Sequence, residues 1–229
     1  MRIFILSSDK TAHALPGTLY LLDKFWTTHP PVIIGGYTKP DIDLHGAWFH
    51  SIGKFEDYPV EKWSDGVIEF LQAYQDELIV LWMDDYWLIR DVDTRAVELL
   101  EKHVLSDSRI SRCDLTVDRL HAGGASVFGT REHLDLITND PPAQYALSFQ
   151  AGIWRRKKLI QYLAPGESAW QSELNGTTRM NMGRAYIIGT KQGPVKYLIA
   201  VQQGHWALDG GYQGSEYALT NELKSEMNL

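Results

Sequence analysis

One apolar run constrains the fold of this chain more than any other feature. Residues 78–83, LIVLWM, contain no charged side chain, and the indole N–H of Trp82 is their only polar side-chain group. A run without polar alternation is typical of a strand that is buried on both faces of a sheet. Such a strand needs helices on both sides, which favours the α/β class. The run leads directly into Asp84 and Asp85, so the end of this strand places two carboxyl groups next to each other.

The remaining pattern alternates strands with helices. Apolar β-rich runs predict strands within residues 2–8, 30–37, 43–53, 110–117 and 145–154. Helical spacing predicts helices within residues 15–26, 60–77, 93–104 and 155–167, and a short helix is expected at 193–206. We therefore predict a single α/β domain over residues 1–229, a Rossmann-like mixed sheet flanked by helices.

Composition limits the classes of function. The net charge of −7 argues against a surface dominated by nucleic-acid binding, although residues 155–158, RRKK, form a local basic cluster. The single cysteine, Cys113, excludes an internal disulfide and a cysteine-based zinc cluster. We see no signal peptide and no apolar run long enough to span a membrane, and we expect a cytoplasmic protein.

Two acidic pairs compete for a role as a binding site. Asp84 and Asp85 follow a buried strand, and ligands of open α/β sheets gather outside the carboxyl ends of strands. If the chain turns there, one carboxylate could bind a divalent ion and the other a sugar or a metal-bound water. A solvated loop or a helix cap is the alternative explanation. Asp91 and Asp93 precede a helical pattern, and Asp93 is better explained as an N-cap.

Three segments together resemble glycosyltransferases of the GT-A fold: the first strand ending in small polar residues, a strand ending in Gly-Gly-Tyr, and residues 80–88, VLWMDDYWL. Residues 145–174 and 194–206 resemble the acceptor-side segment and closing element of small bacterial and phage members. The resemblance covers residues 1–206. It implies a nucleotide-sugar-binding half over residues 1–110 and an acceptor-facing half over 111–229, with a C-terminal flap at 205–217.

The resemblance also implies roles for individual residues. Asp85 would hold Mn²⁺ or Mg²⁺, assisted by Asp84 in the catalytic site, and His205 would be a further metal ligand. Glu173 would be the general base that deprotonates the acceptor, with Glu167 as a substitute. Each of these residues could equally be an ordinary surface side chain.

Donor recognition is expected at the first two strand ends and at the basic cluster. There, backbone, aromatic and guanidinium groups could meet a base and phosphates. The expected donor-binding residues are Ser7, Ser8, Asp9, Gly36, Tyr37, Arg155 and Arg156.

The sequence thus predicts a glycosyltransferase that moves a hexosyl or pentosyl group from a nucleotide-sugar, with UDP as the expected nucleotide, to an acceptor hydroxyl. The acceptor could be a glycan, a protein or a small molecule. One alternative is a phage-type enzyme that modifies hydroxymethylated DNA bases, using the basic cluster. Another is a non-catalytic protein of the same fold that binds a nucleotide-sugar or a glycan.

Overall fold

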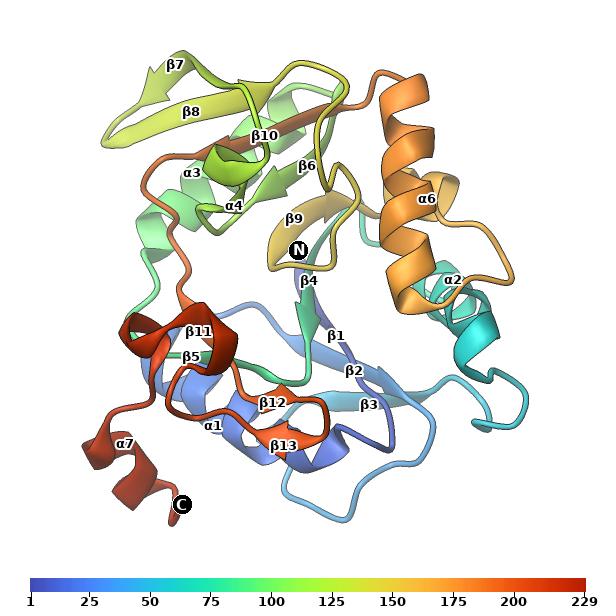
Figure 1. Ribbon diagram of the computed structural model, residues 1–229, viewed down its shortest axis with the longest axis vertical. Helices are drawn as coiled ribbons and strands as arrows, with labels where there is room; N and C mark the ends of the chain where they lie inside the picture. The colour runs from blue at the N-terminus through green and yellow to red at the C-terminus, as the bar shows by residue number, and fades with distance from the viewer.

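Nine strands form one mixed sheet in the computed structural model, which describes residues 1–229 (Figure 1). In spatial order the strands are β3 (Trp48–Ser51), β2 (Val32–Gly36), β1 (Arg2–Leu6), β4 (Leu78–Met83), β9 (Gly152–Arg155), β6 (Ile110–Asp114), β10 (Tyr186–Thr190), β8 (Leu134–Asn139) and β7 (Ala125–Arg131). The predicted α/β class and mixed sheet are confirmed.

Strands β3, β2, β1 and β4 run parallel, and β9 is antiparallel to both of its neighbours, β4 and β6. Strand β10 continues parallel to β6, and β8 and β7 complete the sheet as an antiparallel edge. Because β1, β2 and β4 are parallel and in register, their carboxyl ends meet at one edge of the sheet. The polar residues that follow these three strands therefore lie together.

Helices cover both faces of the sheet. They are α1 (Leu15–Phe25), α2 (Trp63–Gln72), α3 (Thr94–Ser106), α4 (Asp118–His121), α5 (Arg156–Tyr162), α6 (Ala169–Met182) and α7 (Asn221–Glu226). Strand β1 sends Ile3 and Ile5 into a hydrophobic core shared with α1 and α3, and Phe4 and Leu6 into a second core shared with α2, α5 and α6. The alternation of side chains along a strand explains this division. None of the helices is both long and apolar enough to cross a membrane.

The prediction of a helix at residues 193–206 is wrong. This segment forms short strands, β11 (Tyr197–Ile199), β12 (Val201–Gln202) and β13 (His205–Trp206). Strand β11 pairs with β5 (Tyr86–Leu88), and the ring of Tyr197 stacks on that of Tyr86 at 4.1 Å between centroids. Pairing with a strand more than a hundred residues away satisfies the backbone, which overrides the local pattern.

Helix α1 approaches strand β5 too closely for any side chain at Gly17. A Cβ atom there would overlap the buried indole ring of Trp87. We expect Gly17→Ala to lower the free energy of unfolding by about 1–3 kcal/mol in urea denaturation, although alanine is the better helix former. Gly129→Ala is the control, because its Cβ would meet no atom within 4 Å. Equal stability of the two variants would contradict this packing.

Candidate active site

The acidic pair forms the two-residue turn between β4 and β5. The turn is fixed on both sides by backbone contacts: Asp84 N–H donates to Leu6 O at 3.2 Å, and Ala200 N–H donates to Asp85 O at 2.8 Å. The hydroxyl of Thr18 in α1 donates to Asp84 O at 2.5 Å. The chain therefore turns at the strand end. Such a turn is what allows both carboxyl groups to lie at one site.

The carboxylate of Asp84 is held by the loop that follows β1. Its Oδ2 accepts hydrogen bonds from Ser7 Oγ and Thr11 Oγ1, both at 2.7 Å, and from Ser8 N–H at 3.3 Å. Burial raises the pKa of Asp84 to about 6, and these three hydrogen bonds oppose the rise. Asp84 thus fixes the shape of the loop, while Oδ1 accepts none of these bonds.

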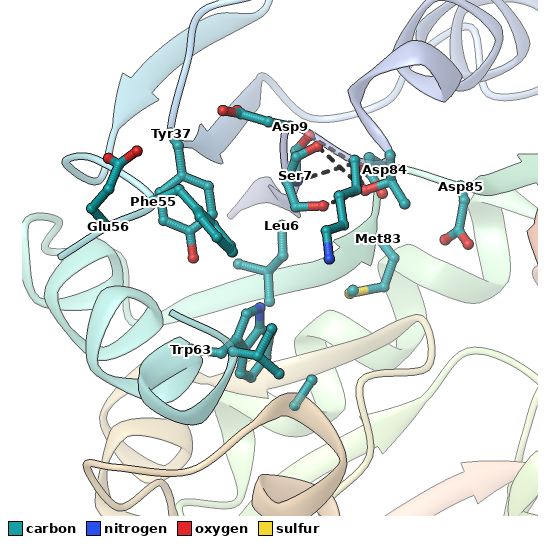
Figure 2. A pocket seen from close by; sticks show the side chains of 15 residues that line it. Leu6, Ser7, Asp9, Tyr37, Phe55, Glu56, Trp63, Met83, Asp84 and Asp85 are labelled. Carbon is teal, nitrogen blue, oxygen red and sulfur yellow. Dashed lines mark hydrogen bonds between the residues drawn. The ribbon is translucent and has the colours of Figure 1, made fainter. Parts of the chain in front are cut away.

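The carboxylate of Asp85 has no such partners. Figure 2 shows it turned away from Ser7 and Asp84, at the rim of the cavity. Burial, and secondarily the neighbouring Asp84, raise the pKa of Asp85 to about 7. Its own backbone N–H opposes the rise only in part, and a partly buried carboxylate without a cation beside it is unfavourable, so a divalent ion would relieve it. The oxygen ligand fits the preference of Mg²⁺ and Mn²⁺.

The cavity at this turn has a volume of about 430 Å³ (Figure 2). It is lined by the predicted residues Ser7, Ser8, Asp9 and Tyr37, together with both acids of the turn. Gly36 lies just beside it, packed against the ring of Phe49. The structure therefore brings together the polar residues that follow β1, β2 and β4, and we call this space the donor cavity.

Sequence reasoning missed nine of the fifteen residues that line the donor cavity, among them Lys10, Thr11, Phe55 and Trp63. Lys10 is the only cationic side chain that lines it. Lys10 and Thr11 could have been found, because they continue the polar stretch after the first strand. Phe55 and Trp63 come from the segment after β3 and carried no local signal. Tyr37 packs edge-on against Phe55 at 5.5 Å between ring centroids, and its contact with a base stays a prediction.

Arg155 and Arg156 lie at the other end of the sheet, which corrects the expected phosphate contact. Arg155 pairs in register with Leu78 at the start of β4, whereas the acidic turn follows its end. The Arg155 guanidinium donates to Ile110 O at 3.0 Å, and that of Arg156 donates to Leu71 O at 2.9 Å and Asp76 O at 2.8 Å. Both are buried. Two of the four cations of the basic cluster, which the DNA-modifying alternative requires, are therefore buried.

His205 does not join the acidic pair. It lies in the exposed strand β13, and no three side chains of the His, Cys, Asp or Glu type converge anywhere in the chain on a position that could hold a metal. The neighbouring Trp206 contacts His13 at 5.0 Å between ring centroids. The expected Asp–Asp–His ligand set is therefore wrong. An ion at Asp85 would need its further ligands from a bound phosphate group and water.

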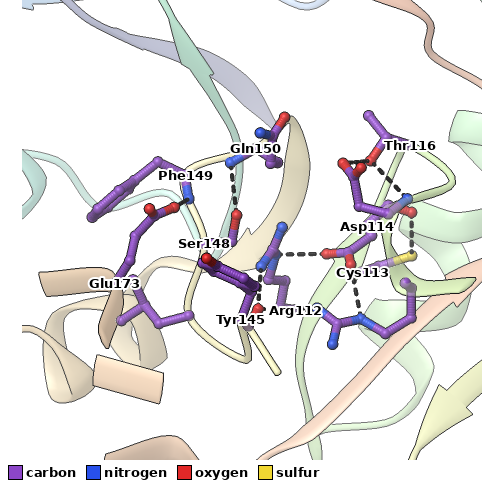
Figure 3. A network of polar contacts seen from close by, with 12 residues as sticks. Arg112, Cys113, Asp114, Thr116, Tyr145, Ser148, Phe149, Gln150 and Glu173 are labelled. Atoms are coloured by element: carbon purple, nitrogen blue, oxygen red, sulfur yellow. Dashed lines mark hydrogen bonds and ion pairs between the residues drawn. The ribbon is translucent and has the colours of Figure 1, made fainter. Parts of the chain in front are cut away.

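Glu173 lies on α6 and faces a second cavity (Figure 3). Its Oε1 accepts a hydrogen bond from Phe149 N–H at 2.8 Å. Burial raises the pKa of Glu173, while Phe149 N–H and Arg112 oppose the rise. A raised pKa suits a carboxylate that accepts a proton near neutral pH. Ala169, one helical turn earlier on the same face, lines the donor cavity, so the two cavities are neighbours along α6.

Glu167, the substitute base, is committed to a structural contact. Its carboxylate accepts two hydrogen bonds from Arg179, both at 2.8 Å, and one from Asn175 at 2.9 Å. Burial alone would raise the pKa of Glu167, but these bonds hold it below the ordinary value. A carboxylate already neutralised in this way is a poor base, which leaves Glu173 as the candidate.

Comparisons with known proteins identify the fold. No protein-family model and no curated sequence matches the chain. Solved structures do match, and the most similar ones share 14% sequence identity or less with this chain. They include sugar transferases and nucleotidyltransferases of the GT-A type, and the chain has a GT-A-like fold. The resemblance in fold seen in the sequence is confirmed.

Three of these structures illustrate the match. Staphylococcus aureus TarS has a TM-score of 0.55 at 11% identity, over 87% of this chain and 36% of that chain. A Bacillus anthracis protein assigned as a glucose-1-phosphate thymidylyltransferase has a TM-score of 0.50 at 10% identity, over 98% and 99%. Glucosyl-3-phosphoglycerate synthase of Mycobacterium tuberculosis, solved with Mn²⁺ and UDP-glucose, has a TM-score of 0.47 at 13% identity, over 82% and 67%. This chain spans 64–68% of the mycobacterial structures that it matches.

Proposed function

We propose that the protein is a glycosyltransferase that transfers a sugar from a UDP-sugar to an acceptor hydroxyl and depends on a divalent cation. The observation that carries the proposal is the partly buried carboxylate of Asp85 at the rim of the donor cavity, which has no ion pair and no side-chain hydrogen bond within the protein. Asp85 would hold the ion, which would neutralise charge on the leaving diphosphate. The GT-A-like fold supports the same reading.

The other groups have complementary roles in this proposal. Ser7, Ser8 and Asp9 would bind the donor at the carboxyl end of β1, where Lys10 adds the one positive charge of the cavity. Asp84 would keep this loop in place through its three hydrogen bonds. Glu173 would accept the proton of the acceptor hydroxyl, since its raised pKa and its place on α6 suit a base next to the donor.

A thermal-shift screen of UDP-, GDP-, TDP- and CMP-sugars with and without Mn²⁺ tests the proposal. A ligand present at 100 times its Kd stabilises the folded state by about 2.7 kcal/mol, which raises Tm by roughly 5–10 °C in a chain of this size. We expect this rise for a UDP-sugar only when Mn²⁺ is present, and none for Mn²⁺ alone. A screen without any shift would contradict the proposal. A shift without turnover of the bound donor would favour the non-catalytic alternative.

A further inference from the structure

A groove lies beside the donor cavity and is formed by two joined cavities. One, of about 410 Å³, is lined by Tyr212 and Tyr217 from the C-terminal segment, and the other, of about 380 Å³, contains Glu173. Asp118 and Gln150 line both cavities, so the two are continuous. We call this the acceptor groove. The two cavities together leave room for a ligand of several linked rings.

Each part of the acceptor groove offers an exposed tyrosine. Tyr145, in the Glu173 cavity, is 55% exposed, and Tyr212, in the other, is 74% exposed. Neither ring packs on another aromatic ring. The ring of Tyr217, in contrast, is covered by Lys196 Nζ at 4.4 Å from its centroid. A free tyrosine ring presents an apolar face together with a polar hydroxyl, which suits the apolar face of a sugar ring and its hydroxyl groups.

Each cation of the acceptor groove has a contact within the protein, but only Arg112 and Arg119 are paired with a carboxylate. Arg90 Nη2 donates to Gly193 O at 3.1 Å, and Lys196 lies over Tyr217. Arg112 lies beside Asp114, with its Nε 2.7 Å from one carboxylate oxygen (Figure 3). The Nε of Arg119 lies 2.9 Å from the other oxygen.

The two acids outside the buried cluster each accept a hydrogen bond, Asp118 from Thr116 Oγ1 and Glu173 from Phe149 N–H. Asp118 and Glu173 line the groove, His121 is its remaining ionisable side chain apart from tyrosines, and the amide of Gln150 adds a neutral hydrogen-bonding group. Outside the buried Asp114 cluster, the two acids Asp118 and Glu173 balance Arg90 and Lys196 in number, so the open part of the lining has no cluster of excess positive charge to favour an anionic ligand. A neutral ligand rich in hydroxyl groups matches this lining better.

The two tyrosines are held in place before any ligand binds. Arg119 donates to Gln144 O at 3.3 Å and to Tyr145 O at 3.2 Å, which fixes the loop that carries Tyr145. Tyr212 N–H donates to the Gln202 side chain at 3.3 Å. Partial burial of its hydroxyl end raises the pKa of Tyr212, as do the charges of Asp85, Asp118 and Glu173. The next residue, Gln213, accepts from Ile199 N–H at 2.7 Å, and Ala200 N–H donates to Asp85 O at 2.8 Å, so the segment that carries Tyr212 lies beside the acidic turn of the donor cavity.

We propose that the acceptor groove binds a neutral oligosaccharide, stacked on Tyr145 and Tyr212, with the reacting hydroxyl beside Glu173. This inference rests on the proposed function, since it names the acceptor of the same reaction. The hydroxyl loses its proton to Glu173 as its oxygen forms the bond to the transferred sugar, and the nucleoside diphosphate leaves with the electron pair of the bond that breaks.

Binding of defined tetrasaccharides, measured by isothermal titration calorimetry, tests the proposal. The neutral probes are maltotetraose, cellotetraose, chitotetraose and mannotetraose, and the anionic probe is tetragalacturonate. We expect at least one neutral probe to bind, and to bind more tightly than the anionic one. Tyr212→Ala and Tyr145→Asn should each weaken this binding by about tenfold or more. Asparagine is chosen because Tyr145 has a φ of 45°, which asparagine tolerates.

The control is Trp48→Ala, which removes an exposed aromatic ring from edge strand β3, away from the acceptor groove, and should leave binding unchanged. Thermal unfolding of each variant checks that it is folded. Failure of all neutral probes, preference for tetragalacturonate, or unchanged affinity in both tyrosine variants overturns the proposal. The rise in Tm with a UDP-sugar is recorded on the same wild-type sample. If that rise is present but no neutral tetrasaccharide binds, only the acceptor-groove proposal fails. If a neutral tetrasaccharide binds but the rise in Tm is absent, only the donor proposal fails.

Discussion

Asp85→Asn is expected to lower the rate of donor turnover by about 100-fold or more. A bound cation contributes several kcal/mol of charge stabilisation to a leaving phosphate, and asparagine keeps the shape of aspartate but not the charge that would hold the ion. Release of UDP from the UDP-sugar identified in the screen is the measurement, at saturating Mn²⁺. The backbone contacts of the turn do not involve this side chain, so the turn should persist.

The matched control is Asp91→Asn. Asp91 is an exposed acid six residues further along the chain and belongs to the pair with literal D-x-D spacing. The structure uses the other member, Asp93, as the N-cap of α3, where it accepts from Ala96 N–H at 2.9 Å, so that prediction is confirmed. Turnover in Asp91→Asn should equal that of the wild type. Wild-type turnover in Asp85→Asn would show that this carboxylate has no role in the reaction.

The same substitution should stabilise the protein when no metal is present. Because the pKa of Asp85 rises from its ordinary value of 3.8 to about 7 in the folded state, the folded protein binds this proton more tightly than the unfolded chain. The contribution to stability is therefore complete below pH 4 and is lost as the pH rises through about 7. Asparagine has no such loss. In EDTA, the Tm of Asp85→Asn should exceed that of the wild type at pH 8, and the difference should shrink at pH 5.

A difference in Tm that is equal at the two pH values would contradict the raised pKa, and a lower Tm for the variant at pH 8 would show that Asp85 stabilises the fold. Each kcal/mol corresponds to about 2–4 °C in a chain of this size, so the effect is within reach of differential scanning calorimetry. A residue that costs stability and serves binding is a common feature of functional sites.

Asp114→Asn is expected to have the largest effect on stability, about 3–5 kcal/mol. Asp114 is fully buried between Arg112 and Arg119, which are also buried. Its removal would leave two guanidinium charges in the interior without a counter-charge. The loss should appear in urea denaturation and lower Tm by roughly 6–20 °C.

Asp107→Asn is the control for this effect. Asp107 also pairs with an arginine, Arg109, but that arginine is highly exposed, and exposed ion pairs contribute little to stability. The control variant should unfold close to the wild type. If the two variants lost the same stability, the buried cluster would not be the structural centre of the acceptor groove.

Local patterns were sufficient to predict the half of the molecule that forms the donor cavity. The apolar run before Asp84 predicted a strand buried on both faces, and helical spacing predicted the existence of α1, α2, α3 and α5, although α2 and α5 are shorter than expected. The carboxyl-edge rule then placed Ser7, Tyr37 and the acidic pair at one site, because parallel strands in register carry their ends to the same edge.

The incorrect predictions concern segments whose structure depends on pairing with strands far away in the sequence. The reversed direction of β9 carries Arg155 to the opposite edge of the sheet, and nothing in residues 155–158 encodes that direction. Strands β5 and β11 pair over more than a hundred residues, and this pairing replaced the expected helix. The edge hairpin β7–β8 and the long helix α6 were not predicted, and α6 brings Glu173 next to the donor cavity.

The most direct test of the central claim is a Mn²⁺ titration followed by electron paramagnetic resonance, which reports the free ion. With UDP present, wild-type protein should reduce the free Mn²⁺ signal beyond the reduction that UDP alone produces, because Asp85 and the diphosphate bind the ion together. Asp85→Asn should show no more than UDP alone. Equal Mn²⁺ binding by the two proteins would contradict a cation held by this carboxylate.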